Sequence, residues 1–307
     1  MSATLSPMSQ FKPPYKYKPQ AKPNLKHLYP LLTLLLTVAA LAQTPTTPDA
    51  PPQTDVTQNA PLNPALPTLF IVGDSTARNQ ADLGWGDHFA HYFDTTKINI
   101  ANRARAGRSS RSYYNEGLWA NVLAEMKPGD YVLIQMGHND GGGDPATDVK
   151  ARSSVKGIGD ETVQYPLPKT FTTGPLAGQT TETVHSYGWY LRKYINDTRA
   201  KKATPILLTP TIRNIWAHDS DGNLRIERDM GYRDYEYQIA ASENVPVIDM
   251  ATVEADSLEA LGPEQTAALF PIDHTHTSPQ GAELAAESVV TALRNANSPL
   301  TSYLKPD

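Results

Sequence analysis

The stretch Phe70-Ile71-Val72-Gly73-Asp74-Ser75 decides how the rest of the chain is interpreted. Its apolar residues are typical of a short buried strand, which ends in a glycine, an acid and a serine. In a parallel α/β sheet, ligands bind at the carboxyl ends of the strands, where loops carry the chemistry. Ser75 is therefore a candidate nucleophile. The alternative is a turn serine that only caps the following helix.

Similar apolar runs recur along the chain and alternate with helix-like stretches. Apolar runs with few polar residues are typical of strands that helices cover on both faces. Strand–helix alternation predicts parallel strands joined by right-handed crossovers. We therefore predict an α/β protein, a three-layer α/β/α sandwich with about five parallel strands. The predicted strands are Leu69–Val72, Ile98–Ala101, Tyr131–Met136, Pro205–Thr209 and Val245–Met250. The predicted helices are Trp85–Phe93, Leu118–Met126, Thr183–Lys202, Met230–Glu243, Thr252–Leu261 and Pro279–Asn295.

Residues 1–42 have the pattern of an export signal. Lysines precede an apolar run from Leu31 to Ala42, which ends in small residues that suit a signal peptidase. That run has twelve residues, whereas a helix that spans a bilayer needs about 20. We therefore expect a signal peptide cleaved before Gln43 and no membrane association after cleavage. This predicts a secreted or periplasmic protein.

Composition divides the rest of the chain. Residues 43–67 contain seven prolines among small polar residues, a composition that cannot bury a core and predicts an extended linker. We place the folded domain at residues 68–300 and a C-terminal tail at residues 301–307. Between Gly141 and Thr183 lies a Gly-, Pro- and Thr-rich segment too long for an ordinary connection. Because this segment follows the third predicted strand, we expect it to lie over the carboxyl edge of the sheet, where the candidate nucleophile is.

Composition also limits the chemistry and the partners. The chain has no cysteine, so thiol nucleophiles, disulfides and thiolate metal sites are excluded. The formal charge is −5, and removal of the five lysines in residues 1–42 leaves 22 basic against 32 acidic residues, a net charge of −10. An acidic mature protein argues against nucleic acid or an anionic membrane as a partner. We expect a monomer that needs no cofactor.

A second polar motif, Asp273-His274-Thr275-His276, supplies what a serine nucleophile requires. Acyl transfer by serine needs a base, an acid that orients the base, and donors for the oxyanion. The spacing lets Asp273 and His276 project from one turn, as orienting acid and general base for Ser75. Gly107 and Asn139 follow the second and third predicted strands. We expect them to form the oxyanion hole with the N–H of Ser75.

These motifs resemble a known family. Gly73-Asp74-Ser75, Gly107, Gly137-His138-Asn139-Asp140 and Asp273-x-x-His276 resemble, in order and spacing, the four blocks of the SGNH (GDSL-like) hydrolases, which are named for Ser, Gly, Asn and His. The Gly-x-Ser-x-Gly elbow of α/β-hydrolases is absent, which favours the SGNH reading. Longer matches resemble the rhamnogalacturonan acetylesterases, carbohydrate esterase family 12. They lie at Ala106 to Tyr113, Gly137 to Gly142 and Phe270 to Pro279.

The resemblance implies a flavodoxin-like SGNH-hydrolase fold, a triad of Ser75, Asp273 and His276, and an oxyanion hole of Ser75, Gly107 and Asn139. It implies a serine esterase that removes acetyl groups from pectic polysaccharide, above all rhamnogalacturonan, through an acetyl-enzyme intermediate. Three alternatives stay open. They are the same chemistry on another glycan such as acetylxylan, a carbohydrate-binding pseudo-enzyme, and a metal-dependent phosphoesterase.

Four arginines crowd the loop after the second predicted strand, on an otherwise acidic protein: Arg103, Arg105, Arg108 and Arg111. Guanidinium groups pair with carboxylates in bidentate fashion, and galacturonate supplies a carboxylate in each unit. We choose Arg108 and Arg111 as substrate-binding residues because they lie nearest Gly107. The alternative is that the arginines pair with acids of neighbouring helices, which we expect for at least two of them.

Other motifs have two readings each. Trp216 follows the fourth predicted strand and either stacks on a sugar or packs in the core, as does Trp85. His138 is either a satisfied histidine at a strand end or a metal ligand beside Asp140, Asp273 and His274; we favour the first and predict no metal site. Residues 218–223 resemble a fragment of a calcium loop but lack its remaining ligands, so we interpret them as a turn.

Overall fold

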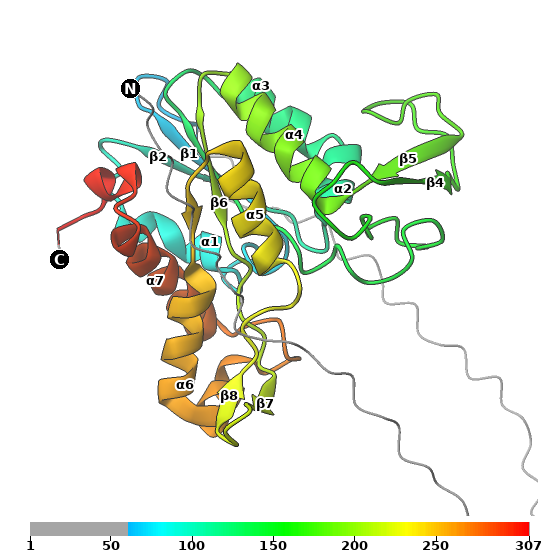
Figure 1. Ribbon diagram of the computed structural model, residues 1–307. Helices are drawn as coiled ribbons and strands as arrows, with labels where there is room; N and C mark the ends of the chain where they lie inside the picture. The colour runs from blue at the N-terminus through cyan, green and yellow to red at the C-terminus, as the bar shows by residue number, and fades with distance from the viewer. Residues whose placement is uncertain (1–60, 307) are drawn as a thin grey trace, which may run out of the picture. The chain divides into compact units, whose positions relative to one another are not determined.

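A computed structural model describes residues 61–306, which lie in one compact unit. The predicted signal peptide and the first part of the predicted linker, up to residue 60, lie outside the described residues. A single parallel sheet has the strand order β2-β1-β3-β6-β9, which confirms the α/β prediction (Figure 1). Its strands are β1 (Thr68–Val72), β2 (Asn99–Asn102), β3 (Tyr131–Ile134), β6 (Thr204–Leu208) and β9 (Val247–Ile248).

The sheet separates two apolar cores, and strand β1 contributes to both. Because side chains alternate along a strand, Leu69 and Ile71 enter one core while Phe70 and Val72 enter the other. All four are fully buried, and each apolar side chain of this size contributes about 1.5–3 kcal/mol when buried. The strand predicted at Leu69–Val72 therefore connects the two apolar layers of the three-layer sandwich.

Helices cover both faces of the sheet, as Figure 1 shows. One core lies under α1, the 3-10 helix η1 and α7, and the other lies under α2 to α5. None of the helices within residues 61–306 combines the length and hydrophobicity that crossing a membrane needs. The helices are α1 (Trp85–His88), η1 (Phe89–Tyr92), α2 (Ser110–Asn115), α3 (Leu118–Glu125), α4 (Tyr187–Ala200), α5 (Arg233–Glu243), α6 (Met250–Leu269), α7 (Pro279–Asn295) and η2 (Pro299–Tyr303).

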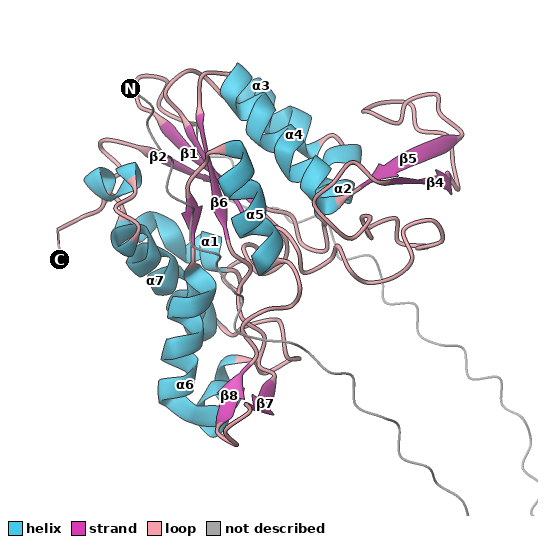
Figure 2. Cartoon of the chain, in the orientation of Figure 1, coloured by secondary structure: helices cyan, strands magenta, loops and turns pink. Residues whose placement is uncertain are grey.

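Two antiparallel hairpins were not predicted, and one of them corrects a helix boundary. The helix expected from Thr183 begins at Tyr187, because Thr181–His185 forms β5 and pairs with β4 (Thr162–Pro166). The Ser186 side chain accepts a bond from the Trp189 N–H and caps α4. Figure 2 shows this hairpin extending beyond α2 and α4. The second hairpin consists of β7 (Trp216–His218) and β8 (Leu224–Ile226).

Both ends of the predicted domain need correction. Leu62, inside the predicted linker, packs against the apolar core, and Asn63 exchanges hydrogen bonds with Asn99 next to β1. At the other end, the predicted tail does not leave the domain. Leu300 is fully buried, and Leu304 forms a β-bridge with Phe93. Both boundaries were placed by composition, which does not reveal these contacts.

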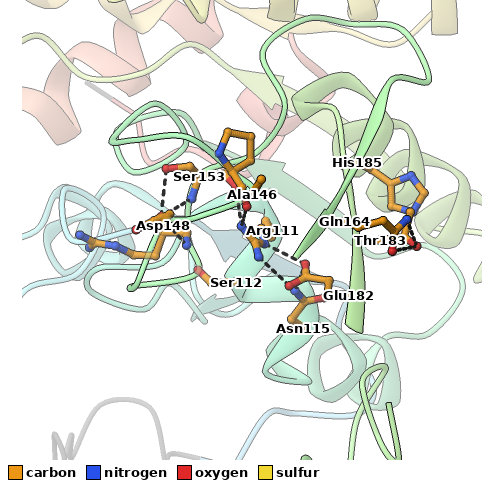
Figure 3. A network of polar contacts seen from close by, with 12 residues as sticks. Arg111, Ser112, Asn115, Ala146, Asp148, Ser153, Gln164, Glu182, Thr183 and His185 are labelled. Atoms are coloured by element: carbon orange, nitrogen blue, oxygen red, sulfur yellow. Dashed lines mark hydrogen bonds and ion pairs between the residues drawn. The ribbon is translucent and has the colours of Figure 1, made fainter. Parts of the chain in front are cut away.

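A buried ion pair holds the long segment after β3 to the α/β layers (Figure 3). Arg111 of α2 makes two bonds to Glu182 of β5, Nε to Oε1 at 2.8 Å and Nη2 to Oε2 at 2.6 Å. Its Nη1 donates to the carbonyl oxygens of Pro145 and Ser153, and its guanidinium lies over the Tyr165 ring of β4. One side chain thus ties both strands of the hairpin and the preceding loop to helix α2.

We predict that Arg111→Met lowers the free energy of unfolding by about 3–5 kcal/mol, because it leaves the Glu182 carboxylate buried without its partner. Urea denaturation followed by circular dichroism measures the change. The double variant Arg111→Met/Glu182→Leu should lose less, since no unpaired charge remains. Arg225→Met, which breaks ion pairs of a half-exposed arginine, is the control and should cost at most about 1 kcal/mol. Equal losses in the Arg111 and Arg225 variants would contradict the prediction.

Candidate active site

Ser75, His276 and Asp273 form a continuous chain of hydrogen bonds. Ser75 Oγ lies 2.9 Å from His276 Nε2, and His276 Nδ1 lies 2.7 Å from Asp273 Oδ2. Asp273 Oδ1 also accepts the backbone N–H groups of Thr275 and His276. Partial burial opposes ionisation of Asp273, but these donated bonds outweigh it and lower the pKa of the carboxyl to about 2. The three residues therefore have the geometry of a nucleophile, a base and an orienting carboxylate.

The turn after β1 fixes the position of Ser75. Asp74 Oδ1 accepts both the N–H and the hydroxyl of Thr76, so the predicted local role of Asp74 is confirmed. Burial raises the pKa of Asp74 to about 6. A Cβ at Gly73 would lie 3.1 Å from the Gln135 carbonyl oxygen, so the backbone passes close to β3 here. The turn thus holds Ser75 at the carboxyl edge of the sheet, where it is 8% exposed.

The loop before α7 brings His276 to Ser75. The Thr277 hydroxyl donates to the carbonyl of Leu83, and the His274 carbonyl accepts the Asn214 N–H. Ser278 caps α7 by accepting the Gly281 N–H, as the sequence predicted. The loop is therefore anchored to the segments that follow both β1 and β6.

Gly107 and Asn139 lie at the same edge, because they follow β2 and β3, the two neighbours of β1. Gly107 has a φ of +75°, a conformation that favours glycine. Within residues 61–306, the N–H groups of Ser75 and Gly107 donate to no protein acceptor. Asn139 Nδ2 donates one hydrogen to the Arg108 carbonyl at 3.1 Å, which leaves its second hydrogen for a ligand. Unused donors at a partly buried edge suit an anionic oxygen.

The long segment after β3 reaches this edge, as predicted, and brings an arginine that the sequence analysis missed. Arg152 Nη1 donates to the Gly107 carbonyl at 3.1 Å and to Asn139 Oδ1 at 3.0 Å. Nothing in the sequence around Arg152 signals this contact, because it depends on how the segment folds back.

The arginine loop needs a correction. Arg111 is wrong as a substrate-binding residue, since its side chain is fully buried and bound to Glu182. Arg108 pairs with Glu116, and Arg103 pairs with Glu125. The expectation that at least two arginines pair with acids is therefore confirmed. Arg108 stays a prediction because a third of its side chain is exposed. Arg105 is exposed and has no acidic partner among the described residues.

The tryptophans favour the packing interpretation. Trp85 is fully buried and donates its indole N–H to Gln135, so it is not a sugar platform. Trp216 packs against an apolar cluster under α6 and donates its indole N–H to Asn214. It is only half-buried, so a contact with substrate stays a prediction.

The two metal hypotheses are not supported by the geometry. Across residues 61–306, His, Asp and Glu side chains form no group of three that could hold a metal ion. His138 instead bonds the Thr211 hydroxyl, and burial lowers its pKa to about 3. The carboxylate of Asp140 is bound by Ser110 and Ser154. Residues 218–223 form the predicted turn, in which Asp219 Oδ1 accepts the N–H groups of Asp221 and Asn223.

A second arginine missed from the sequence lies in the loop after β6. Arg213 Nη2 donates to the His138 carbonyl at 3.1 Å, and no carboxylate among the described residues lies within ion-pair distance of it. Burial lowers the pKa of its guanidinium, and the charges of Asp74 and Asp273 oppose that effect. The preceding residue, Ile212, is held by Glu254 of α6, whose Oε2 accepts the Ile212 N–H at 2.8 Å. Burial raises the pKa of Glu254 from 4.5 to about 8, against the opposing effect of this bond. A carboxyl group that is neutral at pH 7 thus supports the loop.

We predict that Glu254 makes the folded protein less stable as pH rises. Between pH 4.5 and about 8 the folded state keeps the Glu254 proton while the unfolded state has lost it, so stability falls across this window. Glu254→Gln stays neutral and keeps an acceptor for Ile212. Its free energy of unfolding, from urea titrations at pH 5 and pH 9, should therefore decline less than that of the unchanged protein. Glu264→Gln, at an exposed position of α6, is the control. Parallel profiles for all three proteins would refute the assignment.

The comparisons with known proteins agree with this geometry. Residues 71–284 match the model of the GDSL-like lipase/acylhydrolase family. A rhamnogalacturonan acetylesterase of Emericella nidulans is 31% identical over 226 residues, which cover 74% of this chain and 84% of that protein. The rhamnogalacturonan acetylesterase RhgT of Bacillus subtilis is 28% identical over 256 residues, which cover 77% and 93%.

A solved structure shares the fold. The crystal structure of the Bacillus subtilis protein YxiM has a TM-score of 0.58 and 24% sequence identity. The match covers 76% of this chain and 58% of that one, so the chain spans little more than half of that protein's length. The family model covers well over half of the chain and includes Ser75, Gly107, Asn139 and His276. The chain therefore belongs to the GDSL-like lipase/acylhydrolase family of carboxylic ester hydrolases.

Proposed function

We propose that this ester hydrolase is a serine acetylesterase that removes O-acetyl groups from pectic polysaccharide, above all rhamnogalacturonan. The observation that carries the chemistry is the chain of hydrogen bonds from Ser75 Oγ through His276 to Asp273. The unused donors beside it supply the other requirement of acyl transfer, an oxyanion site. Two relatives are named rhamnogalacturonan acetylesterase, which supports acetyl as the acyl group and rhamnogalacturonan as the glycan.

In the proposed mechanism His276 Nε2 takes the proton of Ser75 Oγ as that oxygen attacks the acetyl carbonyl carbon. The carbonyl oxygen becomes an oxyanion and accepts bonds from the N–H groups of Ser75 and Gly107 and from Asn139 Nδ2. The bond between the acetyl carbon and the sugar oxygen then breaks, and His276 gives its proton to that oxygen, which leaves as a hydroxyl group. A water molecule, deprotonated by His276, attacks the acetyl-enzyme, and acetate leaves as Ser75 regains its proton.

Unpaired arginines support a polyuronide over a neutral glycan. Arg105 follows β2 and Arg213 follows β6, so both lie at the carboxyl edge of the sheet. Neither forms a direct ion pair with an acid among the described residues, although Arg103, Arg108 and Arg111 all do. Arg213 is influenced by the charges of Asp74 and Asp273 but is bonded to neither. A carboxylate on the substrate would supply the missing partner. We therefore transfer the substrate-binding role from Arg111 to Arg213 and Arg105.

The proposal extends to location. A polysaccharide substrate and the export-signal pattern of residues 1–42 both support an enzyme that acts outside the cytoplasm, secreted or periplasmic. We also propose that the enzyme is a monomer and needs no cofactor.

We predict that Ser75→Ala lowers kcat for acetate release from acetylated rhamnogalacturonan by at least about 10³-fold, because the nucleophile is lost while the oxyanion donors remain. Ser220→Ala, in the exposed turn between β7 and β8, is the matched control and should keep full activity. An enzymatic acetate assay measures both. Acetate release that survives Ser75→Ala would exclude the serine mechanism. Binding of the glycan without acetate release by the unchanged protein would favour a pseudo-enzyme.

We predict that Arg213→Met lowers kcat/KM for acetylated rhamnogalacturonan about ten- to a hundredfold more than for a small neutral acetate ester, because a charged hydrogen bond to the uronate is lost. Arg199→Met, which breaks the surface pair with Glu243 at the end of α4, is the control. Equal losses on both substrates would make Arg213 structural. Faster acetate release by the unchanged protein from acetylxylan than from rhamnogalacturonan would overturn the arginine argument.

A further inference from the structure

Arg152 contacts two groups of the proposed oxyanion hole at once. A single nitrogen, Nη1, lies within hydrogen-bond distance of the Gly107 carbonyl and of Asn139 Oδ1. Gly107 lies in the loop after β2, whereas Asn139 and Arg152 both lie in the long connection after β3. The guanidinium therefore bridges elements that the sheet alone does not hold together.

The contact decides which way the Asn139 amide points. An arginine has only donors, so the side-chain atom of Asn139 that faces it must be the carbonyl oxygen. This directs Nδ2 away from Arg152, where it donates one hydrogen to the Arg108 carbonyl and keeps the other for a ligand. Without the cation, only the Arg108 carbonyl would oppose a turn of the amide that presents an acceptor where the oxyanion needs a donor.

The backbone that carries Arg152 is itself fixed. The carboxylate of Asp148 accepts the N–H groups of Lys150, Arg152 and Ser153. On the other side, the Ser153 carbonyl is bound by Arg111, within the buried network of Figure 3. Arg152 is thus held between two anchors. Within residues 61–306 no carboxylate pairs with its side chain, so its positive charge stays beside the oxyanion donors.

We propose that Arg152 is a positioning residue for the oxyanion hole, which orients the Asn139 amide and fixes the Gly107 peptide. The proposal rests on the proposed serine mechanism. It gives the long segment after β3 a role in the rate of the chemical step. Preorganised donors stabilise the developing oxyanion because they need not reorient during the reaction.

The test measures kcat and KM on a small neutral acetate ester, whose turnover does not depend on recognition of a carboxylate. Arg152→Met should lower kcat about 10- to 100-fold with KM nearly unchanged, because misplaced donors weaken the transition state and not the ground state. Arg152→Lys should recover part of the loss, since an ammonium can reach one of the two oxygens. Lys150→Met, at an exposed neighbouring position, is the matched control and should keep the original kcat.

A double-mutant cycle separates positioning from a general structural effect. Asn139→Ala should lower kcat about 10²–10³-fold, as loss of one oxyanion donor does. If Arg152 acts through Asn139, then Arg152→Met should cost much less in that background than in the unchanged protein. Multiplicative losses, or a drop in melting temperature that parallels the drop in kcat across the Met and Lys variants, would overturn the proposal.

Two further results can be told apart from a positioning role. A loss confined to KM on the polysaccharide would make Arg152 a substrate-binding residue and would also overturn the positioning role. Failure of the serine mechanism would appear separately, as activity that survives Ser75→Ala.

Discussion

The buried ion pair between Arg111 and Glu182 is the constraint on which the catalytic edge depends. Its two charges are withdrawn from water, so each is tolerated only while the other is in place. The pair joins helix α2, which lies in the layer covering one face of the sheet, to the hairpin of the long segment after β3. The same guanidinium binds the carbonyl of Ser153, the residue after Arg152. The ion pair therefore helps to fix the loop that lies beside Gly107 and Asn139.

The carboxyl edge of the parallel sheet also brings site residues together. Strands that run in the same direction end at the same edge, so the residues after β1, β2 and β3 converge although they are far apart in the sequence. Ser75, Gly107 and Asn139 reach the site in this way. His276 arrives by a different route, on a loop before α7 that is tied to the Leu83 carbonyl and to Asn214. One rigid sheet thus positions the nucleophile and its oxyanion donors, and a braced loop positions the base.

Charge in this protein is distributed unevenly between the core and the catalytic edge. Buried carboxyl groups such as Asp74, Asp140 and Glu254 have raised pKa values because burial disfavours their ionised form. Many arginines form ion pairs with acids, as Arg103 does with Glu125. Arg152 and Arg213, beside the proposed active site, have no acidic partner among the described residues. Positive charge is thus available where an oxyanion would form and where an acidic glycan would bind.

The sequence predicted the parallel sheet, and α7 with its Ser278 cap, because these depend on local periodicity and capping. It did not predict helix α2 or the β4–β5 hairpin. Helix α2 is short, so it gives little periodic signal. The alternating pattern of Thr181–His185 overlaps the helix predicted from Thr183, and the strand was therefore missed. The choice of Arg111 as a substrate-binding residue failed for a related reason. Nothing near Arg111 in the sequence indicates that Glu182 will cover it.

By itself, the sequence determined the fold class, the family and the residues that meet at the carboxyl edge of the sheet, because strand periodicity, turn chemistry and motif spacing are encoded locally. Only the tertiary structure decided which arginines lie free and which are neutralised, where the domain ends, and that Arg152 touches both Gly107 and Asn139. The physical reason is that charge pairing and burial depend on contacts between residues far apart in the chain, and the side chains that make them carry no local signal of their partners.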